Sequence, residues 1–458
     1  MPLSNAQMRD VESLLHPYTN LVKFRETGPL VIERGQGVRV FDDRGKDYIE
    51  GLAGLWCTAL GWGEEALVEV AAEQMRKLAF GHLFAGKSHE PAIALAEKLK
   101  EIAPFPVGRV FFANSGSEAN DTQIKLLWYA NNSRGEAKRK KIISREKAYH
   151  GVTIAAASLT KLPANHRSFD LPLDFARFAE CPHYYRAEMG EDEQAFSERL
   201  AVSLERLIQD EGPETIAAMI VEPIQGAGGV ILPPHGYFER VQEILDRYGI
   251  ALIDDEVITG FGRTGNWFGC TTYAFQPTTM TLAKALSSAY LPISAVLISP
   301  EISQLIEEES GRVGSFGHGY TYTGHPVAAA VALKTIEIFQ ERDIVGHVRS
   351  VSPRFVRRLE RLGDHPLVGE ATGIGLIGAI EIVSDKARKT NFSPAKLTAA
   401  TICRFIEEEG VIARPMLGDR IALCPPLVIT EPEIDEMFDR FERGLQRGLD
   451  WAVSSAGP

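Results

Sequence analysis

The chain is short of cysteine and has no long hydrophobic run. Its five cysteines among 458 residues are scattered, and none forms a CxxC pair, which is typical of a protein kept in a reducing compartment. No apolar stretch reaches the roughly 20 residues that a membrane-spanning helix needs, and the first ten residues contain no apolar core of a signal peptide. We therefore expect a cytoplasmic protein without a membrane partner.

Positive charge is also scarce. The chain has 49 basic and 61 acidic residues, which gives a formal net charge of −12. Such a chain repels phosphate backbones and anionic lipids, so no nucleic-acid partner is expected. The GxSxG motif of serine hydrolases does not occur, and His318 and His325 lack Cys, Asp or Glu neighbours at metal-ligand spacing, so no metal site is expected either.

One glycine pattern is misleading. Residues 373–378 match GxGxxG, the pattern of a dinucleotide-binding turn. The apolar, strand-like residues follow these glycines instead of preceding them, and no helical pattern begins there. A dinucleotide site is therefore not expected.

What the sequence does contain is a regular alternation of strand-like and helical patterns. Strands are predicted at 109–113, 141–144, 217–221, 250–254 and 293–299, and helices near 64–79, 118–130, 192–210 and 236–248. This alternation predicts a mainly parallel sheet with helices on both faces. After residue 326, helical patterns at 327–341, 346–362, 395–410 and 431–447 flank a few short strands. Because a single core stops growing near roughly 250–300 residues, we predict a large domain at 60–326 and a smaller α/β domain made of 1–59 and 327–458.

The most informative stretch combines a strand-end acid with a lysine. The apolar run Ala251-Leu-Ile ends in Asp254-Asp255-Glu256, as expected of a buried parallel strand that delivers acids to its carboxyl end, where open α/β sheets bind ligands. Lys284 follows in an apolar setting that lowers the pKa of an amine and makes it a nucleophile and base. A carboxylate facing a ring nitrogen and a Schiff-base lysine are what pyridoxal phosphate requires, and Asp255 is the candidate for the nitrogen partner. Taken alone, the acids could cap a helix and the lysine could be a solvated surface charge.

A phosphate cradle is predicted earlier in the chain. The strand-like residues 109–113 lead through Ser115-Gly116-Ser117 into the predicted helix. Backbone N–H groups at a helix start, a glycine that allows close approach and a serine hydroxyl together suit a phosphate group. A plain helix N-cap is the alternative interpretation.

These motifs resemble those of the class III aminotransferases of fold type I, in the ω-amine:pyruvate group. The resemblance covers roughly residues 16 to 445. It is carried by Gly54-Leu-Trp56-Cys, Asn114-Ser-Gly-Ser-Glu-Ala-Asn120, Tyr149-His-Gly151, Glu222-Pro-Ile-Gln-Gly-Ala-Gly-Gly229, Asp255-Glu-Val-Ile-Thr-Gly-Phe-Gly-Arg-Thr-Gly265, Lys284 and Gly319-Tyr-Thr321-Tyr-Thr-Gly-His-Pro326.

The resemblance implies a seven-stranded, mainly parallel sheet and a set of roles around pyridoxal 5'-phosphate. Lys284 would form the Schiff base, and Asp255 would pair with the ring nitrogen. Tyr149 and Val257 would hold the ring between them. The remaining cofactor contacts would come from Ser115, Gly116, Ser117, His150 and Glu222, with His150 as a supporting residue and not a general base. Tyr320 and Thr321 would come from the other subunit of a homodimer or a tetramer with shared active sites.

The resemblance also implies the substrate pocket. Its wall would consist of Tyr18, Trp56, Phe84, Ala85, Tyr149 and Ala227, and Arg414 would bind the carboxylate of the oxo acid acceptor, a task that suits a guanidinium. Ornithine- and γ-aminobutyrate-type members carry a glutamate where this chain has Ala227, so Arg414 is expected to be unpaired and free to move. Those members also tend to have glutamine at the position of Ile258, which leaves the contact to the ring hydroxyl open.

The resulting hypothesis is transamination from a primary amine to pyruvate or a similar oxo acid. The alternative within the family is an ω-amino acid or polyamine donor such as β-alanine or putrescine. From a different class, a non-catalytic protein that binds pyridoxal phosphate stays open at this point, although the sequence contains no DNA-binding appendage.

Overall fold

The computed structural model describes residues 3–454, and a seven-stranded sheet forms its centre. The strand order is β4 (Arg109–Ala113), β10 (Ser294–Ile298), β9 (Thr279–Leu282), β8 (Ala251–Asp255), β7 (Ile216–Val221), β5 (Lys141–Arg145) and β6 (Ala176–Ala179). Only β10 runs antiparallel to its two neighbours, and all other pairs are parallel. The predicted seven-stranded, mainly parallel sheet is confirmed.

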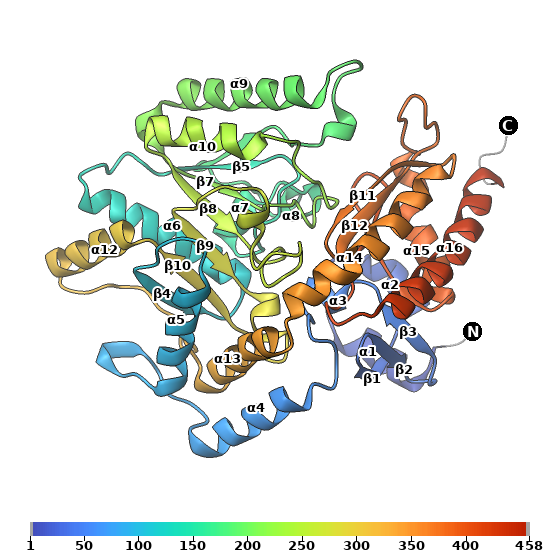
Figure 1. Ribbon diagram of the computed structural model, residues 1–458, viewed down its shortest axis with the longest axis horizontal. Coiled ribbons are helices and arrows are strands. Elements are labelled where there is room, and N and C mark those ends of the chain that lie inside the picture. The colour runs from blue at the N-terminus through green and yellow to red at the C-terminus, as the bar shows by residue number, and fades with distance from the viewer. Residues whose placement is uncertain (1–2, 455–458) are drawn as a thin grey trace.

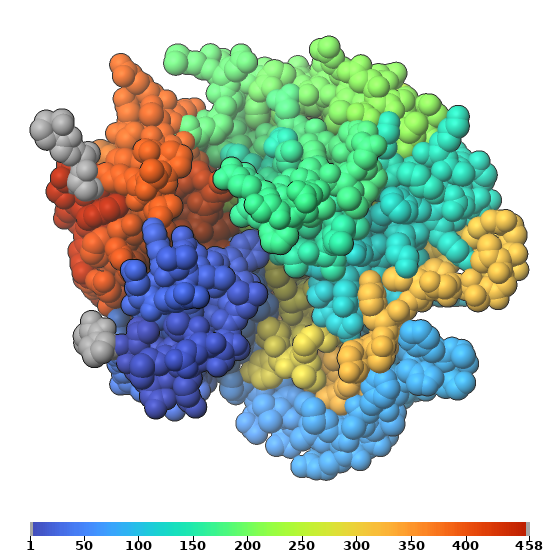
Figure 2. Space-filling model, turned by 180° about the vertical axis from the view of Figure 1, so that it is seen from behind, coloured from blue at the N-terminus to red at the C-terminus, as the bar shows by residue number. Residues whose placement is uncertain are grey.

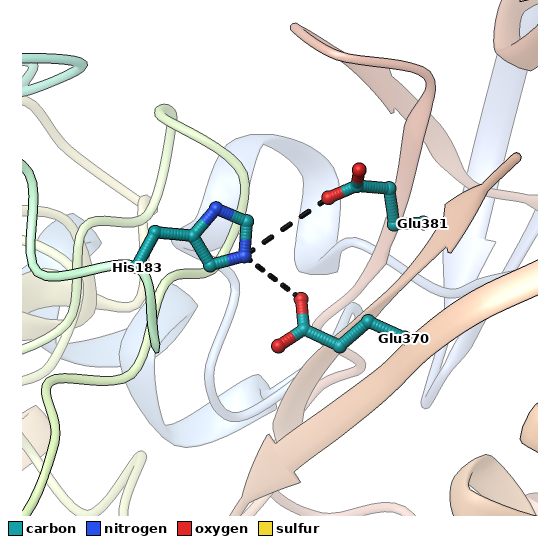
Figure 3. A group of neighbouring side chains, drawn as sticks. All are labelled: His183, Glu370 and Glu381. Atoms are coloured by element: carbon teal, nitrogen blue, oxygen red, sulfur yellow. Dashed lines mark hydrogen bonds and ion pairs between the residues drawn. The ribbon is translucent and has the colours of Figure 1, made fainter. Parts of the chain in front are cut away.

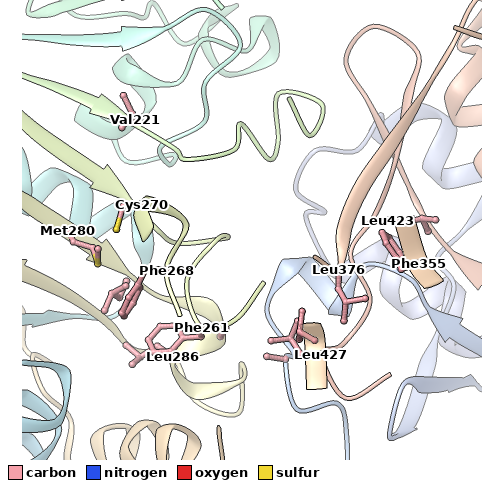
Figure 4. Close-up of a cluster of buried hydrophobic side chains, with 14 of the residues drawn as sticks. Val221, Phe261, Phe268, Cys270, Met280, Leu286, Phe355, Leu376, Leu423 and Leu427 are labelled. Atoms are coloured by element: carbon pink, nitrogen blue, oxygen red, sulfur yellow. The ribbon is translucent and has the colours of Figure 1, made fainter. Parts of the chain in front are cut away.

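The sheet is buried on both faces, as its apolar strands predict. Along β7, Met219 and Val221 pack into one core, whereas Ile220 packs into a second core on the opposite face. The first core continues into the C-terminal part of the chain, so a single apolar cluster joins both parts (Figure 4). Its labelled members are Val221, Phe261, Phe268, Cys270, Met280, Leu286, Phe355, Leu376, Leu423 and Leu427.

Residues 3–454 form sixteen α-helices, which include all eight predicted ones at bounds close to those expected (Figure 1). They are α1 (Asn5–Ser13), α2 (Leu21–Thr27), α3 (Ala53–Trp56), α4 (Glu65–Lys77), α5 (Glu90–Ile102), α6 (Gly116–Ser133), α7 (Ile154–Leu159), α8 (Pro163–His166), α9 (Glu193–Glu211), α10 (Tyr237–Tyr248), α11 (Gly269–Thr272), α12 (Pro300–Val313), α13 (Pro326–Glu341), α14 (Ile344–Arg361), α15 (Thr398–Glu408) and α16 (Glu431–Ser454). Eight helices were not predicted, of which α5 and α12 are the longest, and α16 continues past residue 447 to Ser454. The pattern did not separate out the short strands β6 and β9. None of the helices in residues 3–454 combines the length and apolar character needed to cross a bilayer.

Two four-stranded sheets lie beside the central one, on the right in Figure 1. The first has the order β1 (Ile32–Gln36), β2 (Arg39–Asp42), β3 (Asp47–Glu50) and β13 (Val411–Ile412), so the N-terminal segment shares a sheet with a C-terminal strand. The second has the order β11 (Val368–Ile374), β12 (Ile377–Ile382), β15 (Arg420–Leu423) and β14 (Arg414–Met416). The glycines of 373–378 form the β11–β12 hairpin, in which Gly375 has a φ of +58°.

The predicted domain boundaries at 59/60 and 326/327 stay a prediction. The shared β3–β13 pairing agrees with an N-terminal segment that joins the C-terminal part. Helix α13 begins at the predicted boundary but packs against α4 and α5, which belong to the predicted large domain. The same helix therefore connects the two parts.

A buried charged cluster also links the two parts (Figure 3). His183, in the loop after β6, lies 2.9 Å from Glu370 of β11, and Glu381 of β12 lies 4.0 Å away. Arg420 of β15 donates to both glutamates and, through Nε, to the Gly229 carbonyl oxygen. Burial acts against ionisation, but His183 and Arg420 lower the pKa of Glu370 to about 2. Two guanidinium groups, those of Arg420 and Arg186, thus supply the positive charge that these two carboxylates need.

The close contact of α15 and α16 generates a stability prediction. A Cβ at Gly444 would lie 2.4 Å from the Ile406 Cα, which is backbone and cannot turn away. We expect Gly444→Ala to lower the free energy of unfolding by about 1–3 kcal/mol, because overpacking forces the helices apart. The control Gly311→Ala places its Cβ in open space on α12, and it should stabilise by about 0.5–1 kcal/mol. Denaturant unfolding compares the two, and equal changes would contradict the packing argument.

Candidate active site

A cavity of about 870 Å³ lies at the carboxyl end of the central strands. Four neighbouring strands each deliver a side chain to it. Tyr149 follows β5, Glu222 follows β7, Asp255 ends β8 and Lys284 follows β9. Because these strands are parallel, their carboxyl ends meet at one edge of the sheet, where such sheets bind ligands.

The Asp255 carboxylate is held by three donors at the floor of the cavity. Its Oδ2 accepts from the Asn120 side-chain amide and from His150 Nδ1, both at 2.8 Å. Its Oδ1 accepts from the Val257 backbone N–H at 3.2 Å. Asn120 is held in turn by Thr281, which donates to the amide oxygen at 2.8 Å. Asp255 is only 4% exposed, so these donors replace water around its charge.

His150 occupies the place expected of a supporting residue. Its ring is fully buried next to Asp255, and its backbone carbonyl accepts from Asn120 at 2.7 Å. The backbone N–H of His150 donates to Thr160 at 2.8 Å. The residue is therefore fixed at both ends, which suits positioning of Asp255 better than proton exchange with a substrate.

Lys284 lies in the same cavity, where burial lowers the pKa of its amine. Cys57, Asp255 and Glu222 act in the opposite direction, but burial is the larger effect. The residue has a φ of +50°, a conformation that costs a non-glycine residue about 1–3 kcal/mol and is concentrated at functional sites. A buried amine with a lowered pKa is a usable nucleophile and base.

The helix start at α6 is built for close approach by a ligand. Gly116 and Ser117 line the cavity. A Cβ at Gly116 would lie 3.1 Å from a Val257 methyl group, so a larger residue would fill the space. Ser115 does not line the cavity, because its hydroxyl caps the helix by accepting from the Glu118 N–H at 3.2 Å. For Ser115, the simple N-cap interpretation describes the geometry.

Glu222 organises the loop segments above the sheet. One carboxylate oxygen accepts from the Tyr149 N–H at 3.0 Å and the other from the Gly226 N–H at 2.9 Å. Burial raises the pKa of Glu222 and also that of the Tyr149 phenol. Glu222 thus fixes Tyr149 and the loop that carries Ala227.

The outer part of the cavity is mainly apolar and includes Tyr18, Trp56, Ala227 and Arg414. Trp56 sits in a turn with a positive φ of 65°. Glu50 caps that turn by accepting from the Gly54 N–H, and burial raises its pKa to about 8.

Arg414 has no acidic partner within residues 3–454, as the alanine at 227 predicts. Burial lowers the pKa of its guanidinium, and the phenols of Tyr149 and Tyr18 act in the opposite direction. The side chain is therefore a positive group at the cavity wall that no carboxylate of the described chain neutralises.

Besides Ser115, four predicted residues lie outside the cavity of a single chain: Phe84, Ala85, Tyr320 and Thr321. The Phe84 ring is 47% exposed, and it packs so closely on Gly319 that a Cβ there would lie 3.0 Å from it. The Tyr320 hydroxyl donates to the Glu118 carbonyl oxygen at 3.0 Å. These residues lie at the surface near α6 and not beside Lys284 of the same chain.

The sequence interpretation missed several lining residues. Asn120 belongs to the Asn114–Asn120 motif, but no contact to the site was predicted for it. Its spacing of three from Ser117 places both residues on one helix face. Asn165 and Arg167 come from the segment around α8, and Met416 and Leu417 from the region of β14. No local pattern marks these four positions, since only the tertiary fold brings them to the cavity.

The acids next to Asp255 face away from the cavity. Asp254 is completely buried, and burial together with the nearby Glu256 raises its pKa well above the usual range. Glu256 accepts from the Cys270 N–H at 2.7 Å and from the Thr259 hydroxyl. Of the three consecutive acids, only Asp255 lines the cavity.

Comparisons with known proteins agree with this geometry. The family model "Aminotransferase class-III" matches residues 23–445. The chain is 47% identical over 435 residues to gamma aminobutyrate transaminase 1, mitochondrial, of Solanum lycopersicum, covering 94% of this chain and 84% of that protein. It is 48% identical, with the same coverage, to gamma-aminobutyrate transaminase 1, mitochondrial, of Oryza sativa subsp. japonica. The solved omega transaminase from Pseudomonas jessenii in complex with PMP superimposes with a TM-score of 0.96 at 49% identity, covering 98% of this chain and 99% of that one.

The cofactor of class III aminotransferases is pyridoxal phosphate, and the cavity fits it. The space beside Gly116 accommodates a group that a Cβ would exclude. Asp255 offers a fixed negative charge for a protonated ring nitrogen, and Lys284 offers the amine for the aldehyde. The individual roles of the predicted residues stay predictions that their positions support.

The different environments of two adjacent acids generate a test. Asp255→Asn should lower kcat/KM by about 100-fold or more, because an amide cannot stabilise a positive ring nitrogen. Asp254→Asn should change kcat/KM by less than about fivefold, because the raised pKa already keeps that side chain neutral and an amide has its shape. Steady-state kinetics of both variants, with circular dichroism as a folding check, decides the matter. A comparable loss in Asp254→Asn would contradict the assignment.

Proposed function

Because the chain belongs to the class III aminotransferases, we propose that it transfers an amino group from a primary amine to pyruvate or a similar oxo acid. The products are a ketone or aldehyde and alanine. Transamination itself follows from the family, and the choice of donor and acceptor is the proposal. One observation carries it: a largely apolar cavity of about 870 Å³ that contains both the buried Lys284 amine and the unpaired Arg414.

The described side chains divide the chemistry between them. When bound, pyridoxal phosphate supplies an electron sink for breaking the C–H bond at the amine-bearing carbon. Lys284, with its lowered pKa, would accept the proton from that carbon as general base and then deliver it, as general acid, to the cofactor carbon that carries the bound nitrogen. Asp255 keeps its charge in place by the bonds from Asn120, His150 and Val257. The apolar walls keep water from competing for the proton.

Arg414 provides a reason for an acceptor with a carboxylate. A guanidinium binds a carboxylate through two parallel hydrogen bonds. The residue at 227 is alanine, and no carboxylate within residues 3–454 pairs with the guanidinium of Arg414. An oxo acid such as pyruvate can therefore pair with it, and an uncharged amine donor meets the apolar wall instead.

An ω-amino acid donor is the second candidate. The relatives at 47% and 48% identity are named as gamma-aminobutyrate transaminases, whereas the structural neighbour is named as an omega transaminase. Simple amines and ω-amino acids both have a terminal amine. The preference for one of them therefore depends on the side chains that contact the end of the donor opposite the amine.

A homodimer with shared active sites is also proposed. Phe84, Tyr320 and Thr321 do not reach the cavity of their own chain. Phe80, Phe84 and Tyr322 are all exposed, and the rings of Phe80 and Tyr322 are 5.9 Å apart. The segment around Phe84, in light blue, and the segment around Tyr320 and Thr321, in gold, lie side by side in Figure 2. Exposed apolar patches of this kind favour a protein interface, and a second chain would bring these residues to the other site.

The cytoplasm is the proposed location. All five cysteines are free, and three of them, Cys270, Cys403 and Cys424, are buried as thiols. A reducing compartment preserves this state.

The donor hypothesis predicts a spectroscopic response. The visible band of the Lys284-bound cofactor should disappear when one of 1-phenylethylamine, β-alanine, putrescine or 4-aminobutyrate is added, and pyruvate should restore it. Lys284→Ala should lack turnover and retain some cofactor without a covalent bond, because the amine that moves the proton is gone. Failure of every donor to bleach the band, or near-normal turnover of Lys284→Ala, would refute the proposal.

Shared active sites predict complementation between two inactive chains. Thr321→Glu should repel the cofactor phosphate, and Lys284→Ala lacks the base. Co-expression of the two variants should restore activity, to about a quarter of the wild-type sites for random pairing in a two-fold symmetric dimer. Each variant alone is the control. Differently tagged chains show whether mixed dimers form. If they form but have no activity, the active sites are not shared between the two chains.

A further inference from the structure

We infer that Arg167 is a second carboxylate anchor, which binds the distal carboxylate of an ω-amino acid donor at the mouth of the cavity. The inference rests on the proposed transamination and narrows its donor class. It separates two tasks: Arg414 binds the carboxylate of the oxo acid, and Arg167 binds the far end of the amine.

Arg167 lines the cavity from the segment that follows α8. Its backbone N–H donates to the Pro163 carbonyl oxygen at 3.0 Å, which ends the helical turn and fixes the start of the side chain. Its guanidinium has no hydrogen-bond or ion-pair partner within residues 3–454. In a chain with a net charge of −12, this arginine is left without an acid.

The charges of the cavity are distributed unevenly. The two acids among its lining residues, Glu222 and Asp255, both stand at the carboxyl edge of the central sheet. The wall around α8 contributes Leu162, Pro163 and Ala164 next to Arg167. A carboxylate that enters past this wall therefore meets the positive charge of Arg167, and no acid among the lining residues of this wall competes for it.

The α8 wall is fixed by a buried amide. Asn165 is 8% exposed and donates through Nδ2 to the Tyr18 hydroxyl at 2.6 Å. Its Oδ1 has no hydrogen-bond partner although it is buried. The Asn165–Tyr18 bond ties the segment that carries Arg167 to the N-terminal part of the chain.

The two arginines suit carboxylates at different distances from the reacting carbon. In an oxo acid such as pyruvate, the carboxylate is bonded directly to the carbonyl carbon, so its cation must lie near Lys284. Arg414 meets this requirement, because its charge contributes to the lowered pKa of the Lys284 amine. An ω-amino acid places several methylene groups between amine and carboxylate, and these groups suit the apolar wall that leads to Arg167.

The experiment compares two donors of equal chain length, 4-aminobutyrate and butylamine, which differ in the carboxylate. The rate of loss of the visible band of the holoenzyme gives a specificity constant for each. Arg167→Gln should lower the constant for 4-aminobutyrate about tenfold, as expected for a lost charge-assisted hydrogen bond. It should change the constants for butylamine and for pyruvate by less than about twofold, since neither reaches Arg167. Arg167→Lys should recover part of the loss, because lysine keeps the positive charge but cannot form the two parallel hydrogen bonds of a guanidinium.

Arg206→Gln is the matched control for the change in net charge. Arg206 lies on α9 with a side chain that is 82% exposed, outside the cavity. This variant should leave both donors unaffected. Because Arg167 is itself exposed, the glutamine variant is expected to fold normally, which its melting temperature verifies.

Binding of butanoate, which has no amine to react, gives a readout independent of turnover. Calorimetric titration of the holoenzyme should show a Kd that Arg167→Gln raises at least about fivefold. If Arg414→Gln alone weakens butanoate, or if Arg167→Gln affects both donors equally or neither, the inference is overturned. If no amine bleaches the band of the wild-type protein, the proposed transamination fails instead, and the two failures are distinguishable.

Discussion

The rest of the site depends on one constraint. The carboxylate of Asp255, at the end of β8, has to carry its negative charge without water around it. Burying a lone carboxylate is costly unless donors take the place of water. Asp255 obtains its donors from α6, from the loop after β5 and from the backbone beyond its own strand. The support continues behind it, where Gln123 donates to Thr281 at 3.2 Å and Thr281 donates to Asn120. Three elements must therefore dock correctly before this charge is tolerated.

The same constraint explains the state of the surrounding groups. Asp254 and Glu256 flank the charge, and burial raises the pKa of both. Full ionisation of three neighbouring buried acids would be prohibitive. Burial acts in the opposite sense on Lys284 and lowers its pKa. One desolvated environment thus yields a fixed anion, a neutral acid behind it and an amine able to act as a base.

The reacting end of the site could be predicted from the sequence because strand ends and helix starts leave local signals. The apolar run before Asp255, the small residues at 115–117 and the apolar surroundings of Lys284 are each visible within a few residues. In a parallel sheet, such strand ends necessarily meet at one edge. Ser115 illustrates the limit of this reasoning, since the same motif serves both a phosphate cradle and a helix cap. The extra length of α16 was hidden by Gly448, which weakens the helical pattern just past residue 447 but allows α15 to approach.

The mouth of the cavity could not be predicted in this way, and the reason is physical. Arg167, Asn165 and Met416 come from a short helix, its neighbouring loop and an edge strand, none of which has a periodic pattern. Their relation to Lys284 is set by long-range contacts such as the Asn165–Tyr18 bond, which spans the N-terminal segment and α8. Chemistry is thus encoded at the strand ends of the sheet, whereas donor choice depends on loops that the sheet does not constrain. The chain accordingly has a similar sequence identity to transaminases that are named for different substrates. We propose that in this chain the choice between an amine and an ω-amino acid depends on Arg167 and Arg414, which have no acidic partner within residues 3–454, and that the Asp255–Lys284 pair is common to both.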